Sequence, residues 1–184
     1  AFRNNDSKPR KLLINIIARE QSDATRIIKP FYWKNPIYRW VSFTDLRGGS
    51  KEELAEALRD GAITIWVDDK TDFGLSLIEA IKCGGIVLAK VPEYITDWMM
   101  DGDNLTNAVL WFNDIDDVAN MLPSVIRSWT MDEVPEEVYK NQENINTEFS
   151  YKVIGELSIM DNSAKNSFYQ KEFTLLENQV VQMK

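Results

Sequence analysis

The stretch from Ala62 to Ala89, AITIWVDDKTDFGLSLIEAIKCGGIVLA, decides the fold of this chain. It opens with the apolar run Ala62–Val67, which is typical of a buried strand. Residues Phe73–Lys82 then carry apolar side chains at helical spacing, and the helix ends at the pair Gly84-Gly85. The run Ile86–Ala89 is a second buried strand. Two buried strands joined by a helix predict a strand-helix-strand unit of a parallel sheet.

The same alternation continues on both sides of this unit. Upstream, Lys11–Ala18 is a nearly continuous apolar run, and Ser50 begins a helix as the first residue of a Ser-x-x-Glu capping box. Downstream, Ala108–Phe112 is a short strand, and Ile115–Trp129 is a helix with Asp114 as its N-cap. This alternation predicts an α/β fold, with a doubly wound, Rossmann-like parallel sheet.

The segment between the first strand and the capped helix has weaker signals. Arg26–Lys29 predicts a short helix or turn that Pro30 stops, because proline lacks an N–H and disfavours the helical conformation of the residue before it. Pro30–Pro36 is aromatic and basic, and we expect it to be irregular. The alternation in Tyr38–Phe43 predicts a second strand.

The chain divides into a Rossmann-like domain over residues 1–132 and a more polar C-terminal helical segment over residues 133–184. Pro135–Asn146 predicts a helix, and Phe168–Met183 predicts a final amphipathic helix. We expect this segment to pack on the first domain or on an N-terminal domain that is missing from the chain. The start at Ala1 reads as a cut made in a longer polypeptide.

Composition excludes several functions. The formal net charge of −8 argues against a non-specific nucleic-acid or anionic-membrane surface, and no apolar run is long enough for a transmembrane segment. The chain has no histidine, which removes Ser-His-Asp and Cys-His nucleophiles and the usual zinc sites. Its one cysteine, Cys83, cannot form a disulfide within the chain, which fits a cytoplasmic location. We expect no metal and no cofactor.

The loop after Ala62–Val67 is the candidate binding site, because ligands of open parallel sheets bind beyond the carboxyl ends of the strands. The free N–H groups of Phe73, Gly74 and Leu75 would form an anion site at a helix N-terminus, suited to phosphate. Glu79 lies about one turn further along, where a carboxylate can accept hydrogen bonds from ribose hydroxyls. From these residues alone, a turn glycine and a solvated glutamate are the simpler interpretation.

Residues around this loop also match the pattern of a known family; they are Glu52-Glu53-Leu54, Asp72-Phe73-Gly74-Leu75, Ile78-Glu79-Ala80-Ile81, Gly84 and Val87. In this order of elements the chain resembles the donor-binding half of the retaining GT-B glycosyltransferases of the glycogen-synthase and mannosyltransferase type, also called group 1. The resemblance covers about half of the chain by sequence. It implies that the chain is the C-terminal, nucleotide-sugar-binding half of a GT-B fold.

The resemblance also implies roles for individual residues. Glu79 would be the second glutamate of the family's E-x7-E motif and would bind the donor ribose. The amides of Phe73–Leu75 would hold the donor's sugar and diphosphate. Arg19, at the end of the first strand, together with Arg26 or Lys29, would stabilise the leaving diphosphate, so that no metal is required.

The sequence departs from the family pattern at several positions. Thr71 stands where the family has the first glutamate of the motif, and Asp72 could replace that glutamate only if the loop were shifted. Ile86 stands in place of a proline, and Thr44-Asp45 in place of a glycine near the base pocket. Either the donor differs from that of the family, or the activity is weak or lost.

These observations leave two expected functions. The first is transfer of a sugar, with retention, from a nucleotide sugar to a glycan or other acceptor, in a protein of which this half alone is inactive. The partners would then be the nucleotide-sugar donor and the missing acceptor-binding domain. The second is a degenerate, non-catalytic GT-B-like domain that serves as a binding or assembly module. Retention of nucleotide binding would distinguish the two.

Two further patterns have a simpler and a functional interpretation. Asp68-Asp69 resembles the acidic magnesium pair of response-regulator receiver domains, but the next strand ends without their phosphorylated aspartate, so a solvated loop is the simpler interpretation. The aromatic and basic stretch Phe31–Lys34, with Tyr38, Arg39 and Trp40, could stack a base or a sugar. Packing in a core or between domains is the commoner role of such a cluster.

Overall fold

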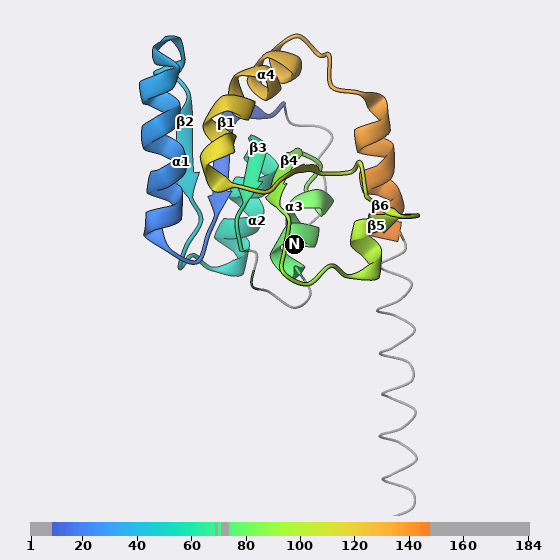
Figure 1. Cartoon of the computed structure of the whole chain (residues 1–184). Helices are drawn as coiled ribbons and strands as arrows, with labels where there is room; N and C mark the ends of the chain where they lie inside the picture. Colours follow the sequence, from blue (N-terminus) through green and yellow to red (C-terminus); the bar gives the residue numbers. More distant parts are fainter. Residues whose placement is uncertain (1–8, 69, 71–73, 148–184) are drawn as a thin grey trace, which may run out of the picture. The chain divides into compact units, whose positions relative to one another are not determined.

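The computed structural model describes residues 9–68, 70 and 74–147. Five parallel strands form one sheet in the order β2-β1-β3-β4-β7 (Figure 1). The strands are β1 Lys11–Ile17, β2 Ser42–Asp45, β3 Gly61–Trp66, β4 Ile86–Lys90 and β7 Leu110–Phe112. This order is that of a doubly wound sheet, so the predicted α/β, Rossmann-like fold is confirmed.

Helices cover both faces of the sheet (Figure 1). On one face lie α1 (Gln21–Lys34) and α4 (Val118–Thr130), the latter preceded by the 3-10 turn η3 (Ile115–Asp117). On the other face lie α2 (Lys51–Asp60) and α3 (Leu75–Lys82). Helices α1, α2 and α3 each connect one strand to the next parallel strand, so they run antiparallel to the strands and begin at the carboxyl edge of the sheet. Helix α4 follows the carboxyl end of β7, the last strand, and so it also begins at that edge.

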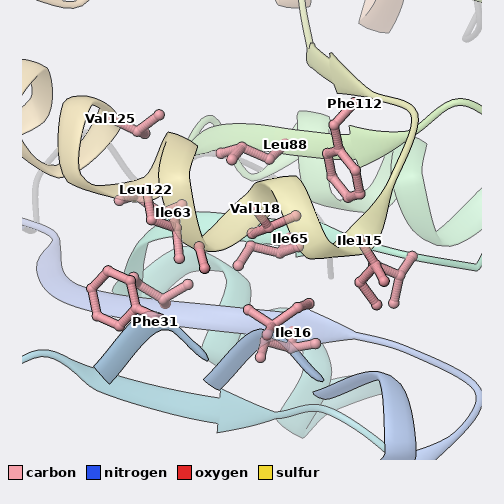
Figure 2. Close-up of a cluster of buried hydrophobic side chains, with 14 of the residues drawn as sticks. Ile16, Phe31, Ile63, Ile65, Leu88, Phe112, Ile115, Val118, Leu122 and Val125 are labelled. Carbon is pink, nitrogen blue, oxygen red and sulfur yellow. The ribbon is translucent and has the colours of Figure 1, made fainter. Parts of the chain in front are cut away.

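Strands β1, β3, β4 and β7 contribute residues to two separate cores, since successive side chains of a strand point to opposite faces. In β3, Ile63 and Ile65 pack toward α1 and α4, whereas Trp66 packs toward α3. Figure 2 shows the first of these cores, in which Phe31 of α1 and Leu122 of α4 meet residues of the sheet. All five side chains are fully buried. The near-continuous apolar runs of the sequence therefore correspond to strands that are covered on both faces.

The sequence correctly predicted the local signals that begin two helices. Ser50 accepts a hydrogen bond from the Glu53 N–H (3.2 Å), and the Glu53 carboxylate accepts one from the Ser50 N–H (2.8 Å), which is the complete capping box. Asp114 accepts from the Asp116 N–H (3.0 Å) at the start of η3. Caps depend on contacts within one turn, which is why the sequence alone indicates them.

The prediction that Pro30 stops the first helix is wrong. Helix α1 continues through Pro30 to Lys34, so the stretch expected to be irregular is helical up to that residue. A proline inside a helix costs about 3 kcal/mol, but α1 buries Ile27 before the proline and Phe31 after it, both with no exposed surface. Burying side chains of that size offsets the cost of the proline, at about 1.5–3 kcal/mol for each.

The second strand is shorter and starts later than its predicted range, Tyr38–Phe43. Pro36–Tyr38 form a 3-10 turn, η1, and β2 begins only at Ser42. The Tyr32 hydroxyl donates to the Val41 carbonyl (2.5 Å), which ties this connection to α1. The aromatic residues that produced the alternation have different environments, since Tyr38 packs against Phe31 whereas Trp40 is exposed.

The connection between β4 and β7 contains short elements that the sequence did not predict individually. They are the 3-10 turn η2 (Asp97–Met99) and the two-stranded hairpin of β5 (Met100–Asp101) and β6 (Asn104–Leu105). Gly102 adopts φ +62° in the hairpin turn. Strands of two residues are too short to produce a recognisable alternation of apolar and polar side chains.

A further helix starts at residue 136, as the sequence predicted, and it packs against the second core. Ile145 is buried there, and the buried Gln142 amide donates to the carbonyls of Gly85 and Ala108, at 3.1 Å each. The helix predicted for Phe168–Met183 lies outside the described residues. The division of the chain at residue 132 stays a prediction. Among the residues that the structure describes, no helix is both long enough and apolar enough to cross a membrane.

Candidate functional site

A cleft opens at the carboxyl edge of the sheet, beyond the ends of β1, β3 and β4. The chain leaves β1 toward α1 on one face and leaves β3 toward α3 on the other, so the cleft lies at the switch point of the doubly wound sheet. Its volume is about 260 Å³. The lining residues are Arg19, Glu20, Asp23, Arg26, Val67, Asp68, Lys70, Lys90 and Ile115. This is the position at which open α/β sheets bind their ligands.

The two arginines of this cleft are both paired with carboxylates. Arg19 follows the end of β1, and its Nε donates to Oδ1 of Asp68, which follows the end of β3. Arg26, in the second turn of α1, lies 3.0 Å from Asp116 and 3.9 Å from Asp114, measured from Nη2 to Oδ1. Residues from elements far apart in the sequence thus meet around the cleft.

These ion pairs leave the arginines available to a ligand. The Arg19 and Arg26 side chains are more than half exposed, and exposed pairs contribute only about 0–1 kcal/mol. A diphosphate carries more charge than one carboxylate, and its oxygens match the guanidinium fork. With Lys70 and Lys90 in the same lining, the cleft has four cations against three carboxylates. The arrangement is suited to an anion that displaces Asp68 from Arg19.

Gly74 is the N-cap of α3, and the structure explains why it is a glycine. Its backbone is left-handed (φ +69°, ψ 37°), a conformation that costs other residues about 1–2 kcal/mol. A Cβ on it would lie 3.0 Å from Cε of Met99 and 3.4 Å from Cζ2 of Trp98. The missing side chain therefore makes room for η2.

The first turn of α3 is anchored from below by Trp66. This fully buried indole donates from Nε1 to Oγ of Ser76, at 2.9 Å. The bond joins the last residue of β3 to the second residue of α3, and so it holds the helix N-terminus beside the strand end. Leu75, the first residue of α3, stays exposed.

Glu79 lies on α3, outside the lining of the cleft. It is half-buried. Burial raises the pKa of its carboxyl group, while the positive charges of Lys51 and Lys82 lower it. Lys51 is the first residue of α2, so Glu79 faces the start of that helix. Arg19 and Arg26 thus line the cleft, whereas Glu79 does not.

The remaining predicted residues either lie away from the cleft or fall outside the described residues. Lys29 lines a different hollow, together with Pro30, Trp33, Lys34 and Asp116. Of the two cations that the sequence left as alternatives, only Arg26 is therefore at the cleft. Thr71, Asp72 and Phe73 lie outside the described residues. The complete donor-binding set stays a prediction.

The sequence did not indicate several lining residues of the cleft. Lys90 is the last residue of β4, and the rule that ligands bind at carboxyl ends of strands would have identified it. Glu20 and Asp23 had no comparable signal, because their direction depends on how α1 packs on the sheet. Asp116, at the start of η3, likewise had no signal in the sequence as a partner of Arg26, with which it pairs at 3.0 Å.

Comparisons with known proteins show similarity at the level of structure only. No protein-family model matches the sequence, and no curated protein matches it either. Among solved structures, the chain is similar to the C-terminal domain of a glycosyl transferase group 1 family protein, LpcC, from Francisella tularensis. The TM-score is 0.50 and the sequence identity 15%, over 81% of this chain and 89% of that chain. The chain therefore has the fold of such a C-terminal domain, as its sequence motifs suggested.

Proposed function

We propose that this chain is the nucleotide-sugar-binding half of a glycosyltransferase, which transfers a hexose with retention to a glycan or another acceptor. The observation that carries the proposal is the cation-lined cleft at the switch point of the sheet, in a domain with this fold. Neither observation is sufficient alone, since a fold hosts many functions and a cleft can bind many anions. Together they support a phosphorylated sugar donor.

In this proposal the arginines act on the leaving group. When the bond from the sugar to the diphosphate breaks, negative charge grows on the phosphate oxygens, and Arg19 and Arg26 stabilise it. Asp68 holds Arg19 in place before the donor binds and then releases it. The amides of Phe73, Gly74 and Leu75 supply N–H groups to the sugar and diphosphate, and Thr71 and Asp72 complete the predicted donor-binding set. Positive charge from the protein then does the work that a metal ion does in other transferases.

The second part of the proposed site recognises the nucleoside. Glu79 accepts hydrogen bonds from the donor ribose, the role that the family motif implies. Ligand-binding clefts typically measure about 300–1,000 Å³, and the cleft here, about 260 Å³, is below that range. A diphosphate fits it better than a whole nucleotide sugar. We therefore include a second, acceptor-binding domain in the proposal, which closes over the donor and contributes further catalytic groups.

The proposal also includes a cytoplasmic location and a role in carbohydrate metabolism. The only cysteine, Cys83, is buried, and burial raises its pKa to about 11. A buried thiol of this kind is inert and needs no oxidising compartment.

Calorimetric titration of the full chain with UDP, GDP and ADP tests the proposal. We expect saturable binding of one nucleotide, and a Kd raised at least about tenfold by Arg19→Ala, because hydrogen bonds to charged groups contribute about 1.5–3 kcal/mol. Arg26→Ala and Glu79→Ala should also weaken binding of that nucleotide, whereas Lys29→Ala should leave its Kd unchanged.

Lys11→Ala is the matched control for this titration. Lys11 pairs with Asp60 at 3.1 Å, much as Arg19 pairs with Asp68, but it lies at the opposite edge of the sheet. Its removal should leave the Kd within about twofold. Equal losses in Lys11→Ala and Arg19→Ala would show that the chain responds to net charge and has no donor site in the cleft.

The second candidate function is a non-catalytic binding or assembly module. It is favoured by the pairing of Arg19 with Asp68 and of Arg26 with Asp116, which fills the cation positions with the protein's own carboxylates. Absence of binding for all three nucleotides, in a protein that unfolds cooperatively, would favour this module over the transferase.

A further inference from the structure

The amino edge of the sheet carries a group of exposed side chains that the proposed function does not use. Within eight residues, Trp33, Ile37 and Trp40 are 83%, 75% and 63% exposed. Lys34 and Arg39, also exposed, lie between them in the sequence. We call these five residues the aromatic–basic patch. All five lie between the end of α1 and the start of β2, and exposed large apolar side chains so close together in a chain are typical of an interaction site.

The patch lies at the opposite end of the molecule from the cleft. Helix α1 begins at the carboxyl edge beside Arg19 and ends at the amino edge with Trp33 and Lys34 (Figure 1). Its 14 residues separate the two ends by about 20 Å, at 1.5 Å per residue. A partner on the patch therefore leaves the cleft open.

A rigid base holds the patch in place. Phe31, fully buried, has ring-centroid distances of 5.6 Å to Tyr32, 5.9 Å to Tyr38 and 5.3 Å to Phe43. The Asn35 amide donates to the carbonyls of Phe31 (3.1 Å) and Ala119 (3.0 Å), which fixes the end of α1 to α4. The exposed tryptophans are thus presented from a packed aromatic cluster, and little ordering is needed when a partner binds.

The stretch of sequence that carries the patch is basic, whereas the chain as a whole is acidic. Residues 29–44 contain three cations, Lys29, Lys34 and Arg39, and no acidic residue, in a chain with net charge −8. One carboxylate, Asp116, shares a hollow with Trp33 and Lys34, and Arg26 pairs with it at 3.0 Å. Charges more than about 8–10 Å away are largely screened at physiological salt, so the local charge decides what binds.

We propose that the aromatic–basic patch docks this protein on an anionic phospholipid surface. Tryptophan is favoured at the boundary between headgroups and acyl chains, because its ring is apolar and its N–H is polar. Burial of Ile37 below the headgroups favours binding to a membrane. A nucleic acid would gain little from Ile37, because this side chain has neither a charge nor an aromatic ring. Lys34 and Arg39 contact the lipid phosphates. The net charge of the chain, which argued against such a surface, does not describe this edge of the sheet.

Flotation of the full chain with phospholipid vesicles tests the proposal. We expect binding to phosphatidylcholine vesicles that contain about 30% phosphatidylglycerol, and much weaker binding to pure phosphatidylcholine, because anionic lipids attract each basic residue near the surface by about 1 kcal/mol. Raising the salt to about 0.5 M should release the protein by screening. Lys34→Gln with Arg39→Gln should lower the partition coefficient about thirtyfold.

A second pair of variants separates insertion from attraction by charge. Trp33→Ser with Trp40→Ser should lower the partition coefficient at least about tenfold, since two large apolar side chains no longer leave water. The matched control is Tyr94→Ser with Ile95→Ser, two residues that are also at least half exposed but lie in another loop. It should bind vesicles as the unchanged protein does. All these side chains are exposed, so urea unfolding should confirm that the variants stay folded.

Several results would overturn the proposal. One is a protein that stays free of anionic vesicles at low salt, and another is equal binding by the patch variants and the unchanged chain. Patch-dependent binding of single-stranded RNA without vesicle binding would assign the patch to nucleic acid instead. A dimer in sedimentation that the tryptophan variants convert to a monomer would assign it to a second copy. None of these results depends on nucleotide binding at the cleft.

Discussion

The two edges of the sheet hold arginine in different ways. At the carboxyl edge, Arg19 and Arg26 are exposed and pair with carboxylates. At the amino edge, the partly buried Arg10 donates to three backbone carbonyls: Leu58 at 3.0 Å, Gly61 at 2.7 Å, and Cys83. These carbonyls belong to the ends of α2 and α3, which have no partners within their helices.

The difference separates a structural cation from cations that can bind a ligand. A backbone carbonyl at a helix end cannot move away from Arg10. An anion that bound Arg10 in its place would leave three carbonyl acceptors, and the negative ends of two helix dipoles, without a cation. An aspartate side chain can rotate away and be hydrated, so an anion can replace it at Arg19 at little cost. The comparison predicts which substitutions change stability and which change binding.

The largest effect is expected for Arg10→Ala, which should lower the free energy of unfolding by about 2–4 kcal/mol. It removes a charged donor and leaves partly buried carbonyls at two helix ends without it. Urea denaturation measures the change, with Lys11→Ala as the control.

Lys11 is the neighbouring cation, but it is exposed and pairs with the Asp60 side chain, so its removal should change stability by no more than about 0.5 kcal/mol. Similar losses of stability in Arg10→Ala and Lys11→Ala would contradict the distinction between the two kinds of cation. The hydrogen bonds of Arg10 to backbone carbonyls would then contribute no more to stability than a surface ion pair does.

The next largest effect is expected at Gly74, the N-cap of α3 at the carboxyl edge of the sheet. Gly74→Ala should cost about 2 kcal/mol, in part from the left-handed backbone and in part from contact with Met99. Gly102→Ala is the control, since Gly102 has a similar φ of +62° but no atom within 4 Å of an added Cβ. It should cost about 1 kcal/mol. Equal costs, measured by thermal or urea unfolding, would mean that the Met99 side chain moves aside freely.

A smaller change in stability is expected for Arg19→Ala. Its pair with Asp68 is exposed on the arginine side, so the free energy of unfolding should fall by no more than about 0.5 kcal/mol, although the nucleotide Kd should rise at least about tenfold. Paired measurements of urea unfolding and nucleotide affinity check this. A loss as large as that of Arg10→Ala would contradict the distinction between exchangeable and structural partners.

The smallest effect is a pH dependence at Glu79. Burial raises the pKa of this carboxyl, so the folded state holds its proton at higher pH than the unfolded state does. Stability from this residue is fully present below the unfolded pKa and is lost as the pH rises through the folded pKa. Glu79→Gln should therefore be slightly more stable than the unchanged protein at pH 7, by about 0.5 kcal/mol or less.

That difference should disappear below about pH 4, where the carboxyl is protonated in both states. Urea unfolding at several pH values measures it. A variant that is less stable than the unchanged protein at pH 7 would show that the attraction of Lys51 and Lys82 outweighs the burial of Glu79.

The sequence was sufficient for most of the fold, for identifiable reasons. The runs at β1, β3 and β4 are apolar throughout because both faces of those strands are covered, and the caps at Ser50 and Asp114 act within one turn. It failed around Pro30, where burial of Phe31 by residues of other elements outweighs a local preference against helix. It also failed at β5 and β6, which are too short to show a period.

The candidate site was predictable in part. The family pattern indicated Arg19, and the rule that ligands bind at carboxyl ends indicated the loop after β3, of which Asp68 and Lys70 line the cleft with Arg19. The choice of Arg26 over Lys29 was not available, because both lie on α1 and only the packing of α1 against α4 shows which one reaches the cleft. The pairing with Asp68 and Asp116 likewise joins residues that the sequence keeps far apart.

By itself, the sequence determined most of the strands and helices and the order in which they follow, because periodicity, capping and burial on two faces are properties of neighbouring residues. Tertiary structure alone decided which charges meet. It paired Arg19 with Asp68, placed Arg10 where it donates to carbonyls at the ends of two helices, and left the Trp33 and Trp40 side chains exposed to solvent. Such contacts depend on how strands far apart in the chain align in the sheet, and no local pattern records that alignment.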